Sequence, residues 1–250
     1  SMLTQERHLQ ILAQLEEKGT VSVAQLTQLL GASESTVRRD LIALDRLGKL
    51  HKVHGGATLT RRDFIRREEK LDEKLQLHMD EKEMIAAYAA AQVDDTDFVY
   101  LDAGSSTLLM IDHLQPGATF VTNGLLHAQR LVAKGMKTYV LGGELKHTTD
   151  AIIGLAAAKN LHNYNFSKCF IGTNGIAIRQ GFTTPDTDEA YLKAAAMERS
   201  FVSYVLADAS KFDKVSTVSF APLDQAAIIT DRLPDPEYGE RTVVKEVALL

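Results

Sequence analysis

The chain has 250 residues, of which 45% are hydrophobic and 24% are charged. This composition is typical of a soluble globular protein and excludes collagen-like, mucin-like and wholly disordered chains. Its apolar stretches are shorter than the roughly 20 residues that cross a bilayer, and no signal-peptide core opens the chain, so we expect a cytoplasmic protein with no membrane partner. The single cysteine, Cys169, lies in an apolar run, which predicts neither an intrachain disulfide nor a zinc cluster.

Basic residues are concentrated in one part of the chain. The net charge is −5, from 28 Lys and Arg against 33 Asp and Glu. Between Ala32 and Arg67, however, nine basic residues stand against four acidic ones, so the remainder of the chain is strongly acidic. A basic block attached to an acidic body indicates a module that touches phosphates joined to one that does not, although charge alone equally allows a solvated basic face.

The first sixty residues predict three helices joined by glycine turns. The first helix ends at Gly19, the second begins at a Ser22 capping box and ends at Gly31, and Ser33 can cap the third. The residues expected to face the core recur at helical spacing and are Leu9, Leu12, Leu15, Val23, Leu26, Leu29, Leu30, Val37, Leu41 and Leu44. The second and third helices, joined by a tight turn, form a helix-turn-helix unit.

The outward face of the third predicted helix carries short hydroxyls and guanidinium groups. Its side chains are Ser35, Thr36, Arg38, Arg39 and Ile42. Such groups near the start of a second helix are what contacts with base edges and phosphates in a major groove require. A basic strand, a glycine turn and a returning strand follow, and Lys52 and His54 of this wing are second candidates for DNA contact. Winged domains also bind proteins, and His54 could equally be an ordinary surface residue.

A larger α/β body is predicted after a charged segment. Residues 58–80 indicate a linker that runs into a helix over about Glu81 to Val93, with Met84, Ile85, Tyr88 and Ala89 as its packing face. Beyond it, helical segments alternate with short apolar runs that begin at Phe98, Thr119, Thr138, Lys168, Tyr204 and Ala227. Runs without polar alternation indicate strands buried on both faces. We therefore expect a DNA-binding domain over residues 2–57, a linker over 58–80 and an open, mostly parallel α/β domain over 81–250.

Most of these predicted strands end in glycine, hydroxyl and amide residues. The endings are residues 102–107, 122–124, 142–144, 172–175 and 208–211. In a parallel sheet such endings lie along one edge, where small ligands bind. The run from Gly104 to Thr107 offers backbone N–H groups and hydroxyls to an anion, and Lys211 could neutralise a phosphate. Each turn alone is more often an ordinary cap, but their recurrence favours a phosphate site.

Two carboxylates, Asp186 and Glu189, follow the segment 181–185. They could contact sugar hydroxyls or act as acid and base. They could equally serve the first turn of a helix, with Glu189 paired to Lys193. The eight histidines show no ligand spacing with carboxylates or cysteine, so we expect no metal.

Motifs across nearly the whole chain match one family in order and spacing. They are residues 35–41, Leu44, Gly48, 54–57, 102–107, 121–123, 141–143, 172–175, 181–183, 189–190, Lys193, Asp208 and 210–212. In combination they resemble the DeoR family of bacterial sugar-metabolism repressors. Residues 2–8, 32–36, 110–112 and 182–186 are similar to the members of that family that control fructose operons.

The resemblance implies a winged helix-turn-helix repressor whose body is related in fold to ribose-phosphate isomerases and glucosamine-phosphate deaminases and senses a phosphorylated sugar, here fructose 1-phosphate. By position, the phosphate would lie on Gly104, Ser105, Ser106 and Thr107. The remaining site would be lined by Asp102, Thr122, Asn123, Asn174, Glu189, Lys193 and Lys211. Many relatives have threonine where this chain has Ser106, and both residues donate a hydroxyl. The resemblance further implies a homodimer or higher homo-oligomer that binds double-stranded operator DNA, uses no cofactor and is released by the sugar phosphate.

Two alternatives remain open at this point. A repressor of the same architecture could respond to tagatose 6-phosphate or deoxyribose 5-phosphate, and the sequence does not separate these sugars. The body could also be a sugar-phosphate isomerase or deaminase, with Asp102, Asp186 or Glu189 as its base. A basic winged domain has no role in such an enzyme, so we predict a regulator without catalytic residues.

Overall fold

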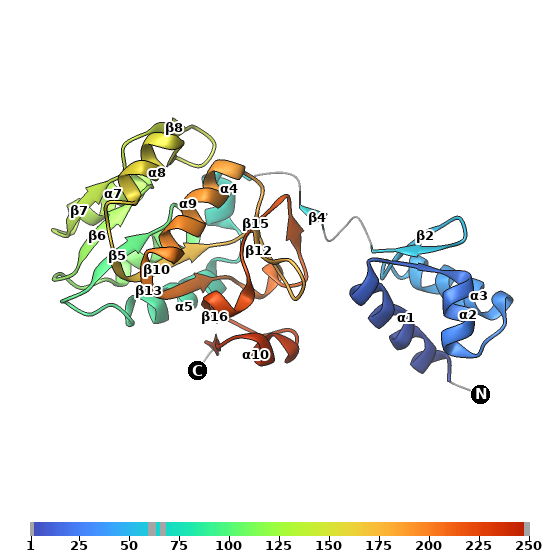
Figure 1. Ribbon diagram of the computed structural model, residues 1–250. Coiled ribbons are helices and arrows are strands. Elements are labelled where there is room, and N and C mark those ends of the chain that lie inside the picture. The colour runs from blue at the N-terminus through green and yellow to red at the C-terminus, as the bar shows by residue number, and fades with distance from the viewer. Residues whose placement is uncertain (1–2, 60–63, 66–68, 248–250) are drawn as a thin grey trace. The chain divides into compact units, whose positions relative to one another are not determined.

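The computed structural model describes residues 3–59, 64–65 and 69–247 (Figure 1). It divides into two compact units, Ser1–Phe64 and Ile65–Leu250, which are described separately below. Four arginines of the basic window, Arg61, Arg62, Arg66 and Arg67, lie outside the described residues. Among the helices that are described, none is long and apolar enough to cross a membrane.

The N-terminal unit is a winged helix-turn-helix domain. Its elements are α1 (Thr4–Lys18), β1 (Thr20–Ser22), α2 (Val23–Leu30), α3 (Glu34–Arg46), β2 (His51–Val53) and β3 (Gly56–Thr58). The strands pair antiparallel in the order β1-β3-β2. The predicted helix ends are present: Gly19 and Gly31 take the left-handed conformation, Ser22 and Gln25 form the capping box, and Ser33 accepts the N–H of Thr36.

The core of this unit lies between the three helices and the sheet. Its fully buried residues include Ile11, Leu15, Leu26, Val37, Leu41 and Leu50. Two predicted core residues are wrong, because Leu9 is 66% exposed and Leu29 is 51% exposed. Ile11 takes the inward position on α1, since helical spacing from Leu15 also fits residue 11. Leu29 lies at the edge of the stripe of α2 that buries Val23, Leu26 and Leu30.

The residues between the two predicted domains contain regular structure. Strand β4 (Phe64–Ile65) and helix α4 (Leu71–Gln76) lie within residues 58–80, and α5 (Met79–Ala90) begins earlier than sequence periodicity suggested. The buried face of α5 consists of Lys82, Ile85, Ala86, Ala89 and Ala90. Met84 and Tyr88, expected on that face, are half-buried, and a lysine is on it instead.

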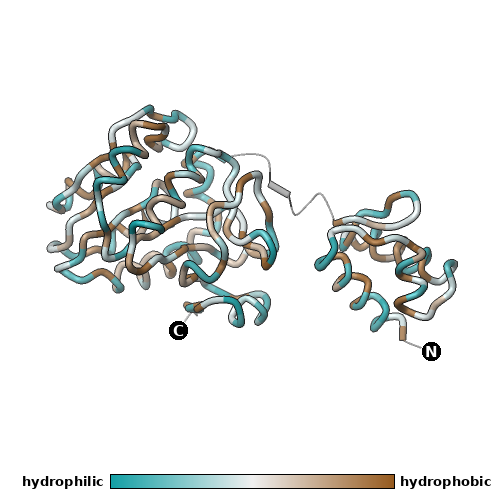
Figure 2. The backbone as a smooth tube through the Cα atoms, viewed as in Figure 1, coloured by the Kyte–Doolittle hydropathy of each residue, from teal (hydrophilic) through white to brown (hydrophobic). Residues whose placement is uncertain are grey.

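A parallel sheet forms the centre of the second unit (Figure 1). Among the described residues its strand order is β17-β16-β13-β10-β5-β6-β7, and every neighbouring pair is parallel. The strands are β5 (Phe98–Leu101), β6 (Thr119–Thr122), β7 (Lys137–Val140), β10 (Phe166–Gly172), β13 (Ser200–Leu206), β16 (Ala227–Thr230) and β17 (Val244–Glu246). The predicted open α/β fold with a mostly parallel sheet is confirmed. Figure 2, coloured by hydropathy, shows that apolar and hydrophilic segments alternate along the chain of this unit.

Helices cover both faces of the sheet. Helices α5, α6 (Ser105–Met110) and α7 (Leu125–Ala133) contribute Ile85, Leu108 and Leu131 to one buried cluster. Helices α8 (Leu155–Leu161), α9 (Thr187–Glu198) and α10 (Glu237–Arg241) contribute Leu161, Leu192 and Tyr238 to the cluster on the other face. Short 3₁₀ turns occur at Ile111–His113, Ala209–Lys211 and Leu223–Gln225.

Small antiparallel elements were not predicted. Strands β11 (Gly175–Ala177), β12 (Gly181–Thr184) and β15 (Val218–Ala221) pair in that order, β8 (Glu144–Lys146) pairs with β9 (Ala151–Ile153), and β14 is Val215–Ser216. The expectation that strands are buried on both faces is wrong for β7, where Tyr139 is 41% and Val140 is 43% exposed. The reason is that β7 is an edge strand of the sheet.

Candidate functional site

The exposed face of α3 carries the predicted DNA-contacting residues. Ser35, Arg38 and Arg39 are exposed and Thr36 is half-buried in the first turns of the helix. Arg38 meets Glu34 at 3.4 Å and Arg39 donates to the carbonyl of Ser35 at 3.3 Å. Ion pairs this exposed contribute little, so phosphates or base edges can replace these partners at small cost.

The wing projects from the same unit. Lys52 and His54 are both exposed, at β2 and at the turn that follows. The backbone N–H of Lys52 donates to Asp45 Oδ1 at 3.1 Å, which fastens the wing to the end of α3. Glycine is required at position 56, where β3 pairs with β1, because a Cβ there would lie 2.1 Å from the carbonyl oxygen of Val21.

A buried carboxylate holds α3 against α1. Asp40 is 5% exposed and accepts hydrogen bonds from Arg7 at 2.7 and 3.1 Å and a contact from His8 at 3.2 Å. This fork geometry fixes the orientation of both helices. The hydrogen bond to Asp40 raises the pKa of Arg7. Sequence reasoning placed Asp40 among the acidic residues of the window and within the motif 35–41, without a structural role.

The candidate ligand site lies at the point where the parallel sheet changes direction. The chain passes from β5 to β6 and β7 on one side, then returns to β10 on the other side of β5. The loops after β5 and β10 therefore separate and leave a crevice at their carboxyl ends. Gly104 and Gly172 approach closely there, since a Cβ on Gly104 would lie 3.8 Å from the Cα of Gly172.

A cavity at this crevice gathers many of the predicted ligand-binding residues. Those that line it are Gly104, Ser105, Ser106, Asn174, Glu189, Lys193 and Lys211. They come from the start of α6, the loop after β10, helix α9 and the loop after β13. Of the other lining residues, Ala103, Gly172, Thr173 and Asp208 belong to the strand endings predicted to meet at this edge. The lining residues with no earlier prediction are Lys74, Lys82, Thr149, Leu206 and Ala207.

Four predicted ligand residues lie behind the cavity instead of lining it. Thr107 donates to the carbonyl of Asp102 at 2.5 Å and accepts the N–H of Gly104 at 3.0 Å. Thr122 donates to the carbonyl of Leu101 at 2.6 Å, and Asn123 accepts the N–H of Ala103 at 3.0 Å. These side chains shape the turn after β5. The physical reason is that each is at most 2% exposed and saturated by backbone partners.

The fourth of these residues, Asp102, forms a buried ion pair with Lys193. Asp102 is 3% and Lys193 is 6% exposed, and Asp102 also accepts the N–H of Gly172 at 2.9 Å. The ammonium of Lys193 donates in addition to the carbonyl of Gly172 at 3.0 Å. The pair therefore joins the ends of β5 and β10 to α9, while Lys193 remains part of the cavity wall.

Lys82 is a candidate ligand-binding residue that sequence reasoning missed. It is 3% exposed, lines the cavity and donates to the carbonyl of Lys74. Burial, and then the charge of Lys211, lower its pKa to about 8. A signal for it existed: Lys82 precedes Ile85, Ala86 and Ala89 by three, four and seven residues, which places a lysine on the buried stripe of α5.

His127 lies directly beneath the turn that begins α6. It is 1% exposed, and its Nε2 lies 2.9 Å from the carbonyl oxygen of Gly104 and 3.1 Å from Thr107 Oγ1. Its Nδ1 is buried and has no hydrogen-bond partner among the described residues. Burial lowers the pKa of His127 to about 4, so the ring is neutral and donates from Nε2 to Gly104.

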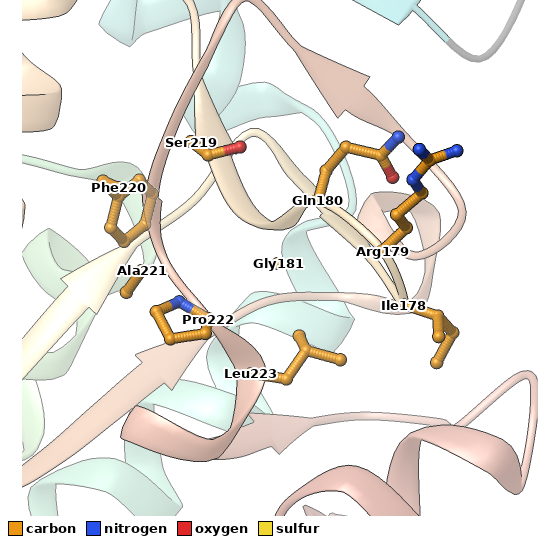
Figure 3. A pocket seen from close by; sticks show the side chains of 9 residues that line it. All are labelled: Ile178, Arg179, Gln180, Gly181, Ser219, Phe220, Ala221, Pro222 and Leu223. Atoms are coloured by element: carbon orange, nitrogen blue, oxygen red, sulfur yellow. The ribbon is translucent and has the colours of Figure 1, made fainter.

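A second, more open cavity of about 350 Å³ lies between β15 and the turn that leads into β12. Figure 3 shows its rim, with Ser219 to Ala221 on one side and Ile178 to Gln180 on the other. Its lining includes one charged side chain, Arg179. The smaller cavity has four lysines and two carboxylates in its lining, which makes it the candidate ligand site.

The carboxylates considered as enzymatic bases have structural partners. Asp186 accepts the N–H of Glu189 and the ammonium of Lys146, both at 2.9 Å, and these bonds lower its pKa although burial acts to raise it. Glu189 accepts a hydrogen bond from Thr149 at 2.9 Å. In the part of the chain that the structure describes, no group of three His, Cys, Asp or Glu residues could hold a metal ion.

Both units match models of one protein family. Residues 7–69 match the DeoR-like helix-turn-helix domain, and residues 77–232 match the DeoR C terminal sensor domain. The chain belongs to the DeoR family. With a DeoR-like helix-turn-helix domain and a DeoR sensor domain, it is a transcriptional regulator and not an enzyme.

Relatives of this DeoR-family chain are similar over nearly their full length. The transcriptional regulator FruR of Bacillus subtilis is 45% identical over 98% of this chain and 99% of its own. The lactose phosphotransferase system repressor of Staphylococcus aureus is 32% identical over 94% of each chain. Among solved structures, ribose 5-phosphate isomerase A of Methanocaldococcus jannaschii has a TM-score of 0.39 and 15% identity over 54% of each chain.

Proposed function

We propose that this repressor acts in the cytoplasm on a fructose utilisation operon, and that fructose 1-phosphate releases it from operator DNA. The 45% identity to FruR supports the choice of operon. A homodimer or higher homo-oligomer would bind a two-fold symmetric operator, with one α3 in each half-site. Ser35, Thr36, Arg38 and Arg39 would meet base edges and phosphates, and Lys52 and His54 would meet the backbone beside them.

The observation that carries the sensor proposal is the accumulation of lysines in one small cavity. Lys74, Lys82, Lys193 and Lys211 all line it. Of the two lining carboxylates, Glu189 is bonded to Thr149 and Asp208 accepts the N–H of Ser210 at 3.0 Å. The lowered pKa of Lys82 shows that burial and neighbouring lysines disfavour its charge when no anion is present. A phosphate dianion reverses this repulsion.

The turn before α6 suits the phosphate itself. Ser105 and Ser106 are each 8% exposed, line the cavity and present hydroxyls and backbone N–H groups at the start of the helix. Asn174, Thr149 and Glu189 occupy other parts of the lining and can hydrogen-bond sugar hydroxyls. The side chains of Asp102, Thr107, Thr122 and Asn123 would act indirectly, by holding this turn in place.

A titration of operator binding tests the proposal. Fluorescence anisotropy of labelled promoter DNA is measured at fixed salt against fructose 1-phosphate, fructose 6-phosphate, tagatose 6-phosphate, deoxyribose 5-phosphate and fructose. Fructose 1-phosphate should release the DNA at the lowest concentration. Release by fructose alone, or by none of these compounds, contradicts a phosphosugar sensor, and preference for another phosphosugar replaces the effector.

Two lysine variants localise the effect. Lys211→Met removes a cation from the cavity and should raise the fructose 1-phosphate concentration for half release by about tenfold or more, because a charge-assisted hydrogen bond contributes roughly 1.5–3 kcal/mol. Lys159→Met, on the exposed face of α8, is the matched control and should leave release unchanged. Equal behaviour of the two variants would remove the cavity from the ligand site.

A further inference from the structure

Helix α4 is too short to be stable by itself. It has six residues, Leu71–Gln76, and neither end has a side-chain cap that the structure records, with a β-region residue on each side. Isolated helices of this length are unstable in water. The helix therefore depends on the contacts it makes with the rest of its unit.

Leu75 packs against the apolar cluster that α5 and α6 share, and several other recorded contacts of α4 are with the cavity wall or with residues beside it. The N–H of Leu71 donates to the carbonyl of Thr148 at 3.3 Å, next to the lining residue Thr149. The carbonyl of Lys74 accepts the buried ammonium of Lys82, which also lines the cavity. Helix α4 packs in addition against α6, whose first residues form the candidate phosphate turn.

The helix also brings its own charge to the cavity. The side chain of Lys74 is part of the lining, together with Lys82 and Lys211. These like charges repel one another across the cavity, and the repulsion acts to push α4 away from α5 and from the loop after β13. An anion between the ammonium groups turns this repulsion into attraction.

We propose that Lys74 and Lys82 are ligands of the bound anion and that the anion thereby fastens α4 to the body. This rests on the proposed phosphosugar site and adds the way in which its occupancy is transmitted. Helix α4 is the first described helix beyond the division between the two units at Phe64 and Ile65. When the anion holds α4 in place, it restrains the start of the sensor unit, to which the DNA-binding unit is joined. Ligand binding would in this way change the affinity for operator DNA.

Hydrogen exchange of the full-length protein measures the fastening directly. Amides of residues 71–77 should exchange about tenfold more slowly with saturating fructose 1-phosphate, whereas amides of α10, which contributes no residue to the lining, should not change. Inorganic phosphate should give a smaller slowing of the same amides. An unchanged exchange rate in residues 71–77 at a ligand concentration that releases DNA overturns the proposal while the sensor function stands.

Two leucines of the same segment provide a matched pair of variants. Leu71 is 4% exposed and outside the cavity lining, whereas Leu77, which follows the helix, is 46% exposed. Leu71→Ala should loosen α4, so that saturating fructose 1-phosphate still binds but changes operator affinity by less than a third of the wild-type factor. Leu77→Ala should keep the wild-type factor.

Ligand binding itself is followed by calorimetry in each variant, and folding by tyrosine fluorescence. If Leu71→Ala binds the ligand and retains the full change in operator affinity, α4 does not transmit occupancy and the proposal fails. If the folded wild-type protein binds none of the phosphorylated sugars, the proposed function fails and takes this inference with it. The proposal is supported if the ligand slows amide exchange in residues 71–77, Leu71→Ala reduces the change in operator affinity, and Leu77→Ala keeps the wild-type change.

Discussion

His127 gives the sensor unit a dependence of stability on pH that can be worked out from the structure. The ring is buried and neutral, its pKa is lowered to about 4, and protonation of Nδ1 would place a charge beside no partner among the described residues. In the unfolded chain the pKa returns to about 6.5. Below that pH, His127 binds a proton in the unfolded state but stays neutral in the folded state.

The free energy of unfolding therefore falls as the pH decreases from about 6.5 toward 4, and His127 has no effect above that range. Each pKa unit corresponds to about 1.4 kcal/mol, so the full loss is about 3 kcal/mol and the loss between pH 7 and pH 5 is about 2 kcal/mol. His127→Gln keeps a side-chain N–H that can reach Gly104 but does not titrate. The variant should lose about 2 kcal/mol less than wild type between these two pH values.

Urea unfolding followed by tyrosine fluorescence measures the difference. The seven tyrosines all lie between Tyr88 and Tyr238, so the signal reports the second unit alone. His147→Gln, at an exposed position of the same unit, is the control and should follow the wild type. If wild type and His127→Gln lose stability in parallel from pH 7 to pH 5, the buried neutral histidine is refuted.

Four further predictions concern the helix-turn-helix unit and the cysteine. Arg38→Ala should weaken operator binding by about 1–3 kcal/mol in anisotropy titrations if the guanidinium contacts a base, and the same affinity as wild type would remove it from the DNA surface. Asp40→Ala breaks the ion pair with Arg7 and should destabilise the packing of α3 on α1, seen as faster amide exchange in α3; unaltered exchange would contradict the role assigned to the pair. Gly56→Ala meets the backbone of β1 and should lower the stability of the unit by about 3 kcal/mol or more, whereas Gly55→Ala, at a φ of +82° with open space around it, should cost about 1–2 kcal/mol; the reverse order in thermal unfolding would be inconsistent with the wing geometry. Cys169 is buried and burial raises its pKa to about 11, so a thiol reagent should label it only as the protein unfolds, and rapid labelling of the native protein would show that the sheet opens.

The sequence predicted those parts of the fold whose signals are local or come from deep burial. Gly19, Gly31 and the Ser22 capping box end or begin helices as expected, because left-handed glycines and capping side chains act on their immediate neighbours. Strands β5, β6, β10 and β13 were found because central parallel strands need apolar residues on both faces.

The missed strands have residues that also suit turns. Strands β11 and β12 consist of Gly175–Ala177 and Gly181–Thr184, so their glycines and hydroxyls indicated loops. Strand β17 carries Lys245 and Glu246 at the sheet edge, where a polar strand is tolerated. These segments become strands because β12 pairs with β15 and β17 pairs with β16. A local sequence pattern contains no information about pairing between residues far apart in the chain.

The same limit applies to the candidate site. Turns such as Gly104 to Ser106 were identified because strand ends of a parallel sheet converge by topology. Whether a polar side chain at such an end faces the cavity or the loop behind it depends on rotamers, and Thr107, Thr122 and Asn123 face the loop. Lys82 was missed because a lysine in a charged segment is assigned by default to solvent.

The cavity has two kinds of wall, which differ in how well they tolerate amino-acid substitution. The turn from Gly104 to Ser106 depends on backbone geometry held by buried partners, so a change there disturbs the end of the sheet. The opposite walls consist of single side chains on separate elements, such as Thr149, Asn174 and Glu189, which can be exchanged one at a time. After gene duplication, one copy could therefore keep its anion-binding turn and change its ligand specificity by point substitutions, with no change of fold.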